Sequence, residues 1–369
     1  MKATRKGAIA FILFIIYVFF SFTVGANALE EPKTQPRVAL SDKNSSDFDI
    51  SSRIYETIFG KGKTEKKNEP VMLIVGGDAF GIKINEERPT VTEIKSAGEF
   101  EVGDKILALD GVDIYSASDI QNVLKSSHGL PLEAVIERSG ERKNITVTPT
   151  LEENGYKLNV SLKQSSVGIG TITFIEPNSN IFGGLGHGVC DSSGELVKMK
   201  SGVATSVILT GVNRGENGKP GELCGMLGKG ILGDVVINSE CGIFGRINAI
   251  PLSEETAIPM GERASVTLGE AEIVSTLKNG KKSSYTIEIT DIDYSSTSSK
   301  SFKIKVTDPS LLAISGGIVR GMSGSPIIQD GKLIGAVTHV MVADPTEGYG
   351  IFIENMLNAA QSQVQPKAA

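Results

Sequence analysis

Apolar residues recur at every second position in short runs along most of the chain, which is the pattern of half-buried strands. Between residues 155 and 360 these runs include KLNVSLK, VGIGTITFI, SYTIEITDI and SFKIKVTD. The dipeptides Asn279-Gly280 and Asp330-Gly331 separate pairs of such runs and predict tight hairpins. Many short strands with few helices predict a barrel or a pair of barrels for residues 155–360.

Residues 69–150 combine strands with one predicted helix. VGDKILALDGVDI alternates into a strand with an Asp-Gly turn, and LEAVIERSGERKNITVTPT predicts a hairpin about a Ser-Gly pair. Between them, SASDIQNVLKSS has an apolar face at helical spacing, and Ser118 and Gln121 predict its capping box. The order strand, strand, helix, hairpin resembles a PDZ domain.

The PDZ resemblance implies peptide ligands for this unit. In PDZ domains a short loop before a strand holds a peptide's C-terminal carboxylate, and the peptide adds a strand to the sheet. The segment matching that loop is AFGI, which is Ala79, Phe80, Gly81 and Ile82. A spacer that binds nothing is the alternative interpretation.

The N-terminal residues differ from the rest. Within residues 1–28, three basic residues precede an uncharged apolar run, and Ala26-Asn27-Ala28 then has the small-x-small pattern of a signal-peptidase site. A cleaved signal peptide and an uncleaved signal anchor both fit a run of this length. In either case we expect the remainder to be exported, with the polar residues 29–68 forming an exposed linker.

Composition narrows the function classes further. The chain has 37 basic and 43 acidic residues and no basic stripe, so no nucleic-acid partner is expected. Its three cysteines show no metal-binding spacing and only three histidines accompany them, so neither a metal nor another cofactor is expected.

The segment GMSGSP, residues 321–326, carries the chemistry. A serine hydroxyl becomes a nucleophile when a base takes its proton and N–H donors receive the oxyanion. Gly-x-Ser-Gly-x-Pro is the nucleophile loop of trypsin-like peptidases, which makes Ser323 the nucleophile and the backbone N–H groups of Gly321 and Ser323 the oxyanion hole. A plain turn, or Ser325 as nucleophile, is the alternative. Met322 replaces the acid that pairs with a new N-terminus in trypsin-like enzymes, so that activation route is not expected.

The general base must be one of three histidines. His187 lies in FGGLGHGVCD, well before Ser323, as the His-Asp-Ser order of trypsin-like peptidases requires. His339 follows the nucleophile in GAVTHV, where a peptidase lines its cleft, and His128 lies in a loop of the first unit. We therefore predict His187 as the base, with His339 as the alternative.

The acid that orients the base is open on residue patterns alone. It must be buried and accept a hydrogen bond from the imidazole. The candidates are Asp191, Asp234, Asp291, Asp293 and Asp308.

Three segments together resemble the stage IV sporulation serine peptidases, SpoIVB: FGGLGHGVCD, VTDPSLLAISGGIVRGMSGSPIIQDGKLIGAVTHV and DPTEGYGIFIENM. The resemblance covers residues 70–360. It implies a mostly β chain in which a PDZ-like α/β domain precedes a trypsin-like double β-barrel peptidase domain. It also implies His187, Asp308 and Ser323 as the catalytic residues, with Asp308 as the acid.

The resemblance carries implications for biology. Such a peptidase is exported from the forespore into the space between forespore and mother cell. It cuts itself, then a membrane-bound inhibitor of an intramembrane metalloprotease, and so triggers processing of a late mother-cell sigma factor precursor. The alternatives are an exported quality-control serine peptidase and a catalytically inert PDZ adaptor.

Overall fold

The computed structural model describes residues 70–362, apart from 97, 192–193, 249–256 and 278–279. The predicted signal segment, residues 1–28, and the predicted linker, residues 29–68, lie outside the described residues. Among the described residues, no helix has the length and apolar character that crossing a membrane requires.

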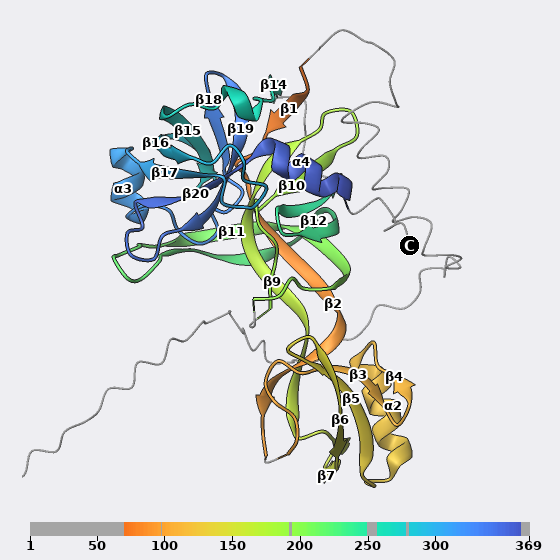
Figure 1. Ribbon diagram of the computed structural model, residues 1–369. Coiled ribbons are helices and arrows are strands. Elements are labelled where there is room, and N and C mark those ends of the chain that lie inside the picture. Colours follow the sequence, from red (N-terminus) through yellow and green to blue (C-terminus); the bar gives the residue numbers. More distant parts are fainter. Residues whose placement is uncertain (1–69, 97, 192–193, 249–256, 278–279, 363–369) are drawn as a thin grey trace, which may run out of the picture. The chain divides into compact units, whose positions relative to one another are not determined.

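The first barrel is a ring of six strands. The sheet runs in the order β9-β10-β13-β12-β11-β2, and β2 also pairs with β9, which closes the ring (Figure 1). β14 and β1 extend the sheet beyond β9. The strands are β1 Met72–Val75, β2 Ala79–Ile94, β9 Val160–Ile175, β10 Ile181–Gly184, β11 Met199–Asn213, β12 Glu222–Ser239, β13 Gly242–Ile247 and β14 Ala257–Pro259.

The second barrel is closed by six antiparallel strands in the order β15-β16-β17-β20-β19-β18. Apolar side chains that alternate along these strands, such as Ile273, Ile287 and Ile304, form its core. The elements are the 3-10 helix η1 Arg263–Ser265, β15 Gly269–Thr276, β16 Lys282–Ile292, β17 Phe302–Val306, α3 Pro309–Ser315, β18 Pro326–Gln329, β19 Lys332–Val340, β20 Glu347–Phe352 and α4 Ile353–Ser362. The predicted pair of barrels is therefore confirmed, although the first barrel also contains β2, which lies outside the predicted range of residues 155–360.

The PDZ-like unit has its own core, formed by residues between Val91 and Leu158. Its strands β3, β5 and β6 continue the sheet from the distal end of β2, and α2 packs its apolar face on them. The elements are β3 Lys105–Leu109, β4 Val112–Asp113, α2 Ala117–Ser127, β5 Leu132–Arg138, β6 Glu141–Val147, β7 Thr150–Glu152 and β8 Gly155–Lys157.

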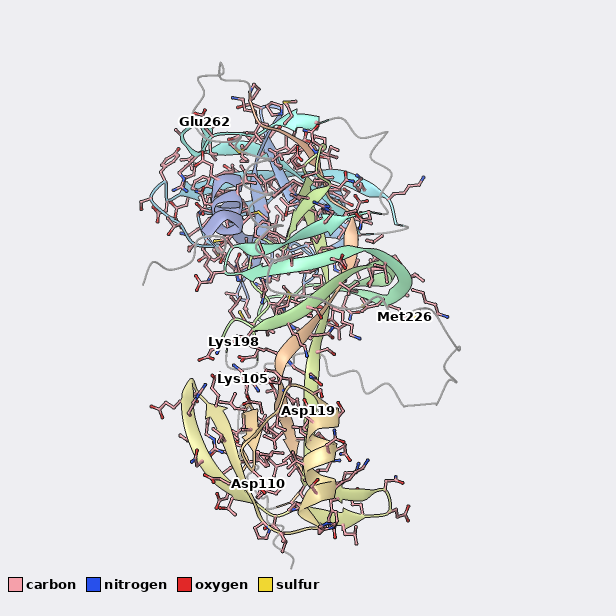
Figure 2. All side chains as sticks on the ribbon, turned by 90° about the vertical axis from the view of Figure 1, so that its right-hand side faces the viewer. Lys105, Asp110, Asp119, Lys198, Met226 and Glu262 are labelled. Atoms are coloured by element: carbon pink, nitrogen blue, oxygen red, sulfur yellow. The ribbon has the colours of Figure 1, made fainter. Side chains whose placement is uncertain are left out.

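The short-range signals in this unit predicted its local structure well. The turn at Asp110-Gly111 has φ of 46° and 75°, the left-handed conformation that such hairpins require. The helix α2 begins where predicted, but its N-cap is Ser116, two residues before the predicted Ser118. Ser116 accepts from the backbone N–H of Asp119, and the Asp119 carboxylate accepts from the N–H of Tyr115. Figure 2 labels Asp119 on this helix. The capping box is therefore Ser116–Asp119 instead of Ser118–Gln121.

The predicted peptide groove at Ala79–Ile82 is wrong. Residues 79–85 of β2 pair with β9 along one edge, and residues 81–86 pair with β11 along the other edge. A peptide cannot add a strand to a segment whose two edges are already paired. Phe80 and Ile82 also belong to the core of the first barrel. The PDZ-like unit therefore begins within β2, after residue 86, and not at residue 69.

Candidate active site

The nucleophile loop joins the end of α3 to β18 and contains Ser323. Gly321 and Gly324 have φ of +97° and +93°, a conformation that side chains other than hydrogen disfavour. A Cβ on Gly324 would lie 2.0 Å from the carbonyl oxygen of Thr171. The path of the loop therefore requires glycine at both positions, which explains the two glycines of the motif Gly-x-Ser-Gly.

Two threonines on β9 hold this loop from the first barrel. The Oγ1 of Thr171 donates to the carbonyl of Gly321 at 2.9 Å, and the N–H of Thr171 donates to the carbonyl of Ser323 at 2.9 Å. The Oγ1 of Thr173 donates to the carbonyl of Gly324 at 2.8 Å. Sequence reasoning missed both residues. The signal was the pair of hydroxyls in GTITF, on alternate positions of an otherwise apolar run.

The backbone N–H groups of Gly321 and Ser323 remain available to a substrate. Among the described residues, neither donates to another backbone or side-chain acceptor, whereas Met322 donates to Val319 and Gly324 donates to Val337. Two unpaired donors on one turn are the arrangement that stabilises the oxyanion of acyl transfer. These are the two donors that the sequence predicts as the oxyanion hole.

The two serines of the loop have different environments. Ser323 is partly exposed, and its Oγ donates to the carbonyl of Thr338 on β19 at 2.8 Å. The Oγ of Ser325 is fully buried and donates to the Oγ of Ser275 at 3.1 Å. Because a buried hydroxyl inside a packed barrel cannot reach a substrate, the geometry favours Ser323 as the nucleophile.

His187 follows β10 on a tight loop in which Leu185 and Gly186 both have positive φ. Its Nδ1 lies 2.9 Å from the carbonyl oxygen of Gly188. A carbonyl oxygen can only accept, so the proton resides on Nδ1 and Nε2 keeps its lone pair. This is the tautomer that a general base needs.

The structure brings His187, His339 and Ser323 together. A Cβ on Gly186 would lie 2.8 Å from the Cγ2 of Thr338, the residue whose carbonyl accepts from Ser323. The rings of His187 and His339 have centroids 5.0 Å apart. Burial lowers the pKa of His187 below its ordinary value, and burial together with the neighbouring His187 and Lys300 lowers the pKa of His339 to about 4. Both imidazoles are therefore neutral at pH 7.

Asp308 lies elsewhere, as the N-cap of α3. Its Oδ1 accepts from the N–H groups of Ser310 and Leu311 at 2.8 and 3.0 Å. Its Oδ2 accepts from the N–H of Thr286 at 3.4 Å, and the hydroxyl of Ser310 donates to Oδ1. These donors hold the pKa of Asp308 below its ordinary value. No hydrogen bond joins Asp308 to His187 in the part of the chain that the structure describes.

The remaining predicted acids also have other surroundings. Asp291 forms an ion pair with Lys303 at 2.8 Å, and Asp293 accepts from the N–H of Ser295 at 2.9 Å. Asp191 is buried and accepts from the N–H of Glu195. Asp234 is exposed on β12. His128 is exposed at the C-terminus of α2.

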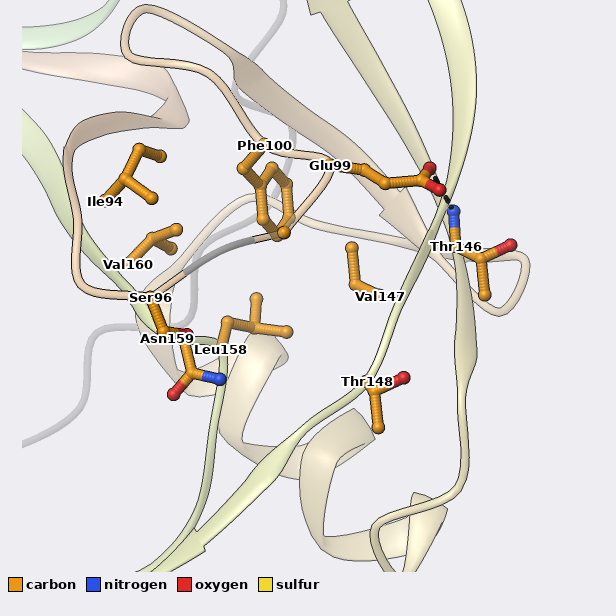
Figure 3. A pocket seen from close by; sticks show the side chains of 11 residues that line it. Ile94, Ser96, Glu99, Phe100, Thr146, Val147, Thr148, Leu158, Asn159 and Val160 are labelled. Atoms are coloured by element: carbon orange, nitrogen blue, oxygen red, sulfur yellow. Dashed lines mark hydrogen bonds between the residues drawn. The ribbon is translucent and has the colours of Figure 1, made fainter.

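A pocket of about 160 Å³ lies in the PDZ-like unit, away from the serine (Figure 3). Phe100, Val147 and Leu158 give it an apolar wall, and at its rim the Glu99 carboxylate accepts from the N–H of Thr146 at 3.1 Å. Within the described residues, no group of three or more His, Cys, Asp or Glu side chains could hold a metal ion.

Several known proteins are similar to parts of this chain. Over 84 residues the chain is 31% identical to the zinc metalloprotease RasP of Geobacillus kaustophilus, a match that spans 21% of this chain and 20% of RasP. The PDZ domain of an SdrC-like protein from Listeria monocytogenes is 16% identical, with a TM-score of 0.19, and the match covers 21% of this chain and 87% of that one.

Two peptidase structures are also similar. The active form of the Rv3671c protease from M. tuberculosis is 10% identical with a TM-score of 0.32, and 69% of this chain and 90% of that chain are covered. The HtrA-type protease AlgW with a decapeptide is 9% identical with a TM-score of 0.34, over 78% and 64% of the two chains.

A family model supplies the identity. The model of the SpoIVB peptidase S55 matches residues 154–357, more than half of the chain, and this range contains Ser323, His187 and every strand of the second barrel. The chain therefore belongs to the SpoIVB peptidase family S55, and it is a serine endopeptidase of sporulation.

Proposed function

We propose that this protein is an exported endopeptidase that first cleaves itself and then cleaves a membrane-bound inhibitor of an intramembrane metalloprotease. Release of that inhibition triggers processing of a late mother-cell sigma factor precursor. Membership of the SpoIVB family supports the reaction and its place in sporulation. The observation that carries the chemistry is the loop at Ser323, a partly exposed residue beside two N–H donors that have no acceptor among the described residues.

The proposed reaction uses three groups. The Oγ of Ser323 attacks the scissile carbonyl carbon, and its proton passes to the Nε2 of His187. The N–H groups of Gly321 and Ser323 bind the oxyanion of the tetrahedral intermediate. The imidazolium then protonates the leaving amine, and water hydrolyses the acyl-enzyme in a second round with the same groups. Asp308 as the acid of this triad stays a prediction, because its carboxylate is bonded within α3 and to Thr286.

The substrates are also part of the proposal. Residues 29–68 are polar and rich in lysine, serine and glutamate, a composition typical of an accessible tether, and we place the first self-cleavage there. The PDZ-like unit is proposed to bind peptides at a site other than Ala79–Ile82, whose edges are paired. The apolar run within residues 1–28 supports export and location at the forespore membrane or in the space between forespore and mother cell.

The test compares residues 29–369 of the wild type with Ser323→Ala and Ser325→Ala, with fragment masses followed over hours. We expect the wild type and Ser325→Ala to produce the same N-terminal fragments, and Ser323→Ala to remain intact. Fragments that persist in Ser323→Ala would contradict the proposal. Broad digestion of added casein would favour the quality-control alternative over narrow cleavage.

A further inference from the structure

One edge of β9 is free over residues 160–170. The strand runs unbroken from Val160 to Ile175 and is shared by the PDZ-like unit and the first barrel. Its residues 160–171 pair with β2 along one edge, whereas β10 covers the other edge only from residue 172 onwards. In the part of the chain that the structure describes, no backbone group pairs with that other edge between residues 160 and 170. A free edge of this kind can accept an additional strand.

One end of the free edge lies beside the nucleophile. The N–H of Thr171 donates to the carbonyl of Ser323 at 2.9 Å, so it points away from β2 and towards the nucleophile loop. Because the N–H and C=O groups of a strand alternate between its two edges, those of Ile169 and Val167 point the same way. Val167 is 51% exposed, which leaves this stretch open to a peptide. A substrate at Ser323 that continues in extended form can therefore pair with β9 from Ile169 onwards.

The other end of the free edge lies beside two backbone donors. The N–H groups of Leu158 and Asn159, in the loop between β8 and β9, have no acceptor among the described residues. Both residues line the pocket of Figure 3, so this loop can be reached from outside the chain. Successive backbone N–H groups without an intramolecular acceptor are the usual receptor of a peptide's C-terminal carboxylate.

The start of α2 lies beside the middle of the edge. The side-chain amide of Gln164 donates to the carbonyl of Tyr115 at 2.6 Å and accepts from the N–H of Ala117 at 3.3 Å. A peptide that passes this point displaces the amide, which then offers the peptide the same donor and acceptor. A single strand thus connects the two backbone donors before β9 with the nucleophile loop.

We propose that a substrate pairs with β9 from its C-terminus to its scissile bond, so that cleavage occurs at a set distance from a free C-terminal carboxylate. This inference rests on the proposed function and adds the substrate class, an extended segment that ends in a free carboxylate. The carboxylate binds the N–H groups of Leu158 and Asn159, and the peptide runs antiparallel to β9 towards Ser323. Because paired strands advance by the same rise per residue, about ten residues separate the carboxylate from the peptide residue opposite Ile169.

The experiment uses the full chain and a library of random-sequence peptides longer than the edge of β9, each made as the C-terminal acid and as the C-terminal amide. Cleavage positions and rates are measured by mass spectrometry. We expect the acid peptides to be cut mainly about ten to thirteen residues before the C-terminus. The amide is expected to raise KM about tenfold or more with little change in kcat, because the carboxylate is bound equally in the ground state and the transition state.

A matched pair of variants at Val167 tests the edge itself. The N–H of Val167 points away from β2, so Val167→Pro removes a donor from the free edge without removing a bond to β2. Val167→Thr keeps the N–H and the branched side chain. We expect Val167→Pro to cut acid and amide peptides equally slowly and at scattered positions, and Val167→Thr to behave as the wild type. Fluorophosphonate labelling of Ser323 and the melting temperature are expected to be the same in all three proteins.

The inference is overturned if the wild type cuts at positions unrelated to the C-terminus, or if acid and amide peptides have the same KM. Labelling of Ser323 without cleavage of any acid peptide would also overturn it. If Val167→Pro fails to fold, the comparison of acid and amide in the wild type still decides. Self-cleavage is followed in the same samples: its absence, with acid peptides cut at the expected distance, would contradict the proposed function and leave this inference standing. Self-cleavage together with peptide cuts unrelated to the C-terminus would do the reverse.

Discussion

The nucleophile loop and the histidine loop are supported very differently. All four carbonyls of residues 321–324 accept hydrogen bonds, three of them from Thr171 and Thr173 on β9. The ring of His187, by contrast, has one hydrogen-bonding contact among the described residues, to the carbonyl of the next residue in the chain. The nucleophile and its oxyanion donors are therefore preorganised, whereas the base can change partners. Activation of this enzyme is accordingly expected to concern the histidine and not the serine.

The largest effect on activity is expected from Gly321→Ala, which tests whether the nucleophile loop is preorganised. The residue has φ of +97°, and a Cβ would lie 2.9 Å from the side chain of Leu223. The peptide is expected to rotate and to withdraw its N–H from the oxyanion. Loss of one such donor reduces the rate by about 100- to 1,000-fold. The measurement is the rate of self-cleavage beside the melting temperature.

The matched control is Gly331→Ala, at a turn with φ of +73° and open space around the glycine. It introduces comparable backbone strain away from the site and is expected to leave the cleavage rate unchanged. If Gly321→Ala cleaves at the wild-type rate, the loop does not depend on that glycine and the oxyanion hole lies elsewhere.

A smaller effect is expected when one of the two threonines loses its hydroxyl. Thr171→Val removes the hydrogen bond to the carbonyl of Gly321, which orients the peptide next to the oxyanion donors. Each such bond contributes about 0.5–1.5 kcal/mol, so we expect about a two- to tenfold fall in rate. Thr173→Val removes a bond to Gly324, one residue beyond Ser323.

The threonine pair is informative because both side chains are fully buried on the same strand. Similar losses of unfolding free energy are expected from the two variants, but only Thr171→Val is expected to slow cleavage strongly. Equal rates in both variants would show that β9 supports the barrel without orienting the oxyanion donors.

Features that depend on local backbone geometry could be predicted from the sequence, whereas features that depend on distant strand pairing could not. The nucleophile loop and the hairpins at Asp110-Gly111 and Asp330-Gly331 were predictable because glycines at positive φ are local requirements. The groove at Ala79–Ile82 was wrong because β2 is one strand of 16 residues shared by two units. The partners of Ala79–Ile82 on β9 and β11 come more than 80 residues later, and no local pattern reveals such pairing.

The candidate site shows the same limit. Ser323 and His187 were predicted from motifs. The hydrogen bonds from Thr171 and Thr173 to the nucleophile loop were not, because they join residues about 150 positions apart in the sequence. Asp308 was assigned as the acid by resemblance, although Asp before Pro also predicts a helix N-cap, which is where the structure has it. The contact between His187 and His339 likewise arises only when two barrels meet.

The smallest effect is expected on the pH dependence of the free energy of unfolding, which reports on the surroundings of the two buried histidines. Burial lowers the pKa of both His187 and His339 in the folded protein, while the unfolded chain retains values near 6.5. Between pH 6.5 and about 4 the unfolded chain therefore binds more protons, so the free energy of unfolding should be complete above pH 6.5 and fall as the pH is lowered. Each histidine adds at most about 1.4 kcal/mol per pH unit to that slope.

Urea denaturation from pH 7 to 4.5 in the Ser323→Ala background measures this slope without self-cleavage. The range stays above the ordinary pKa of aspartate, so the carboxylates whose pKa is lowered, such as Asp308, contribute little to it. His339→Gln is expected to reduce the slope, and His128→Gln, at an exposed histidine, is expected to leave it unchanged. An unaltered slope in His339→Gln would mean that the pKa of His339 is the same in the folded and the unfolded protein, and that burial does not disfavour its charged form.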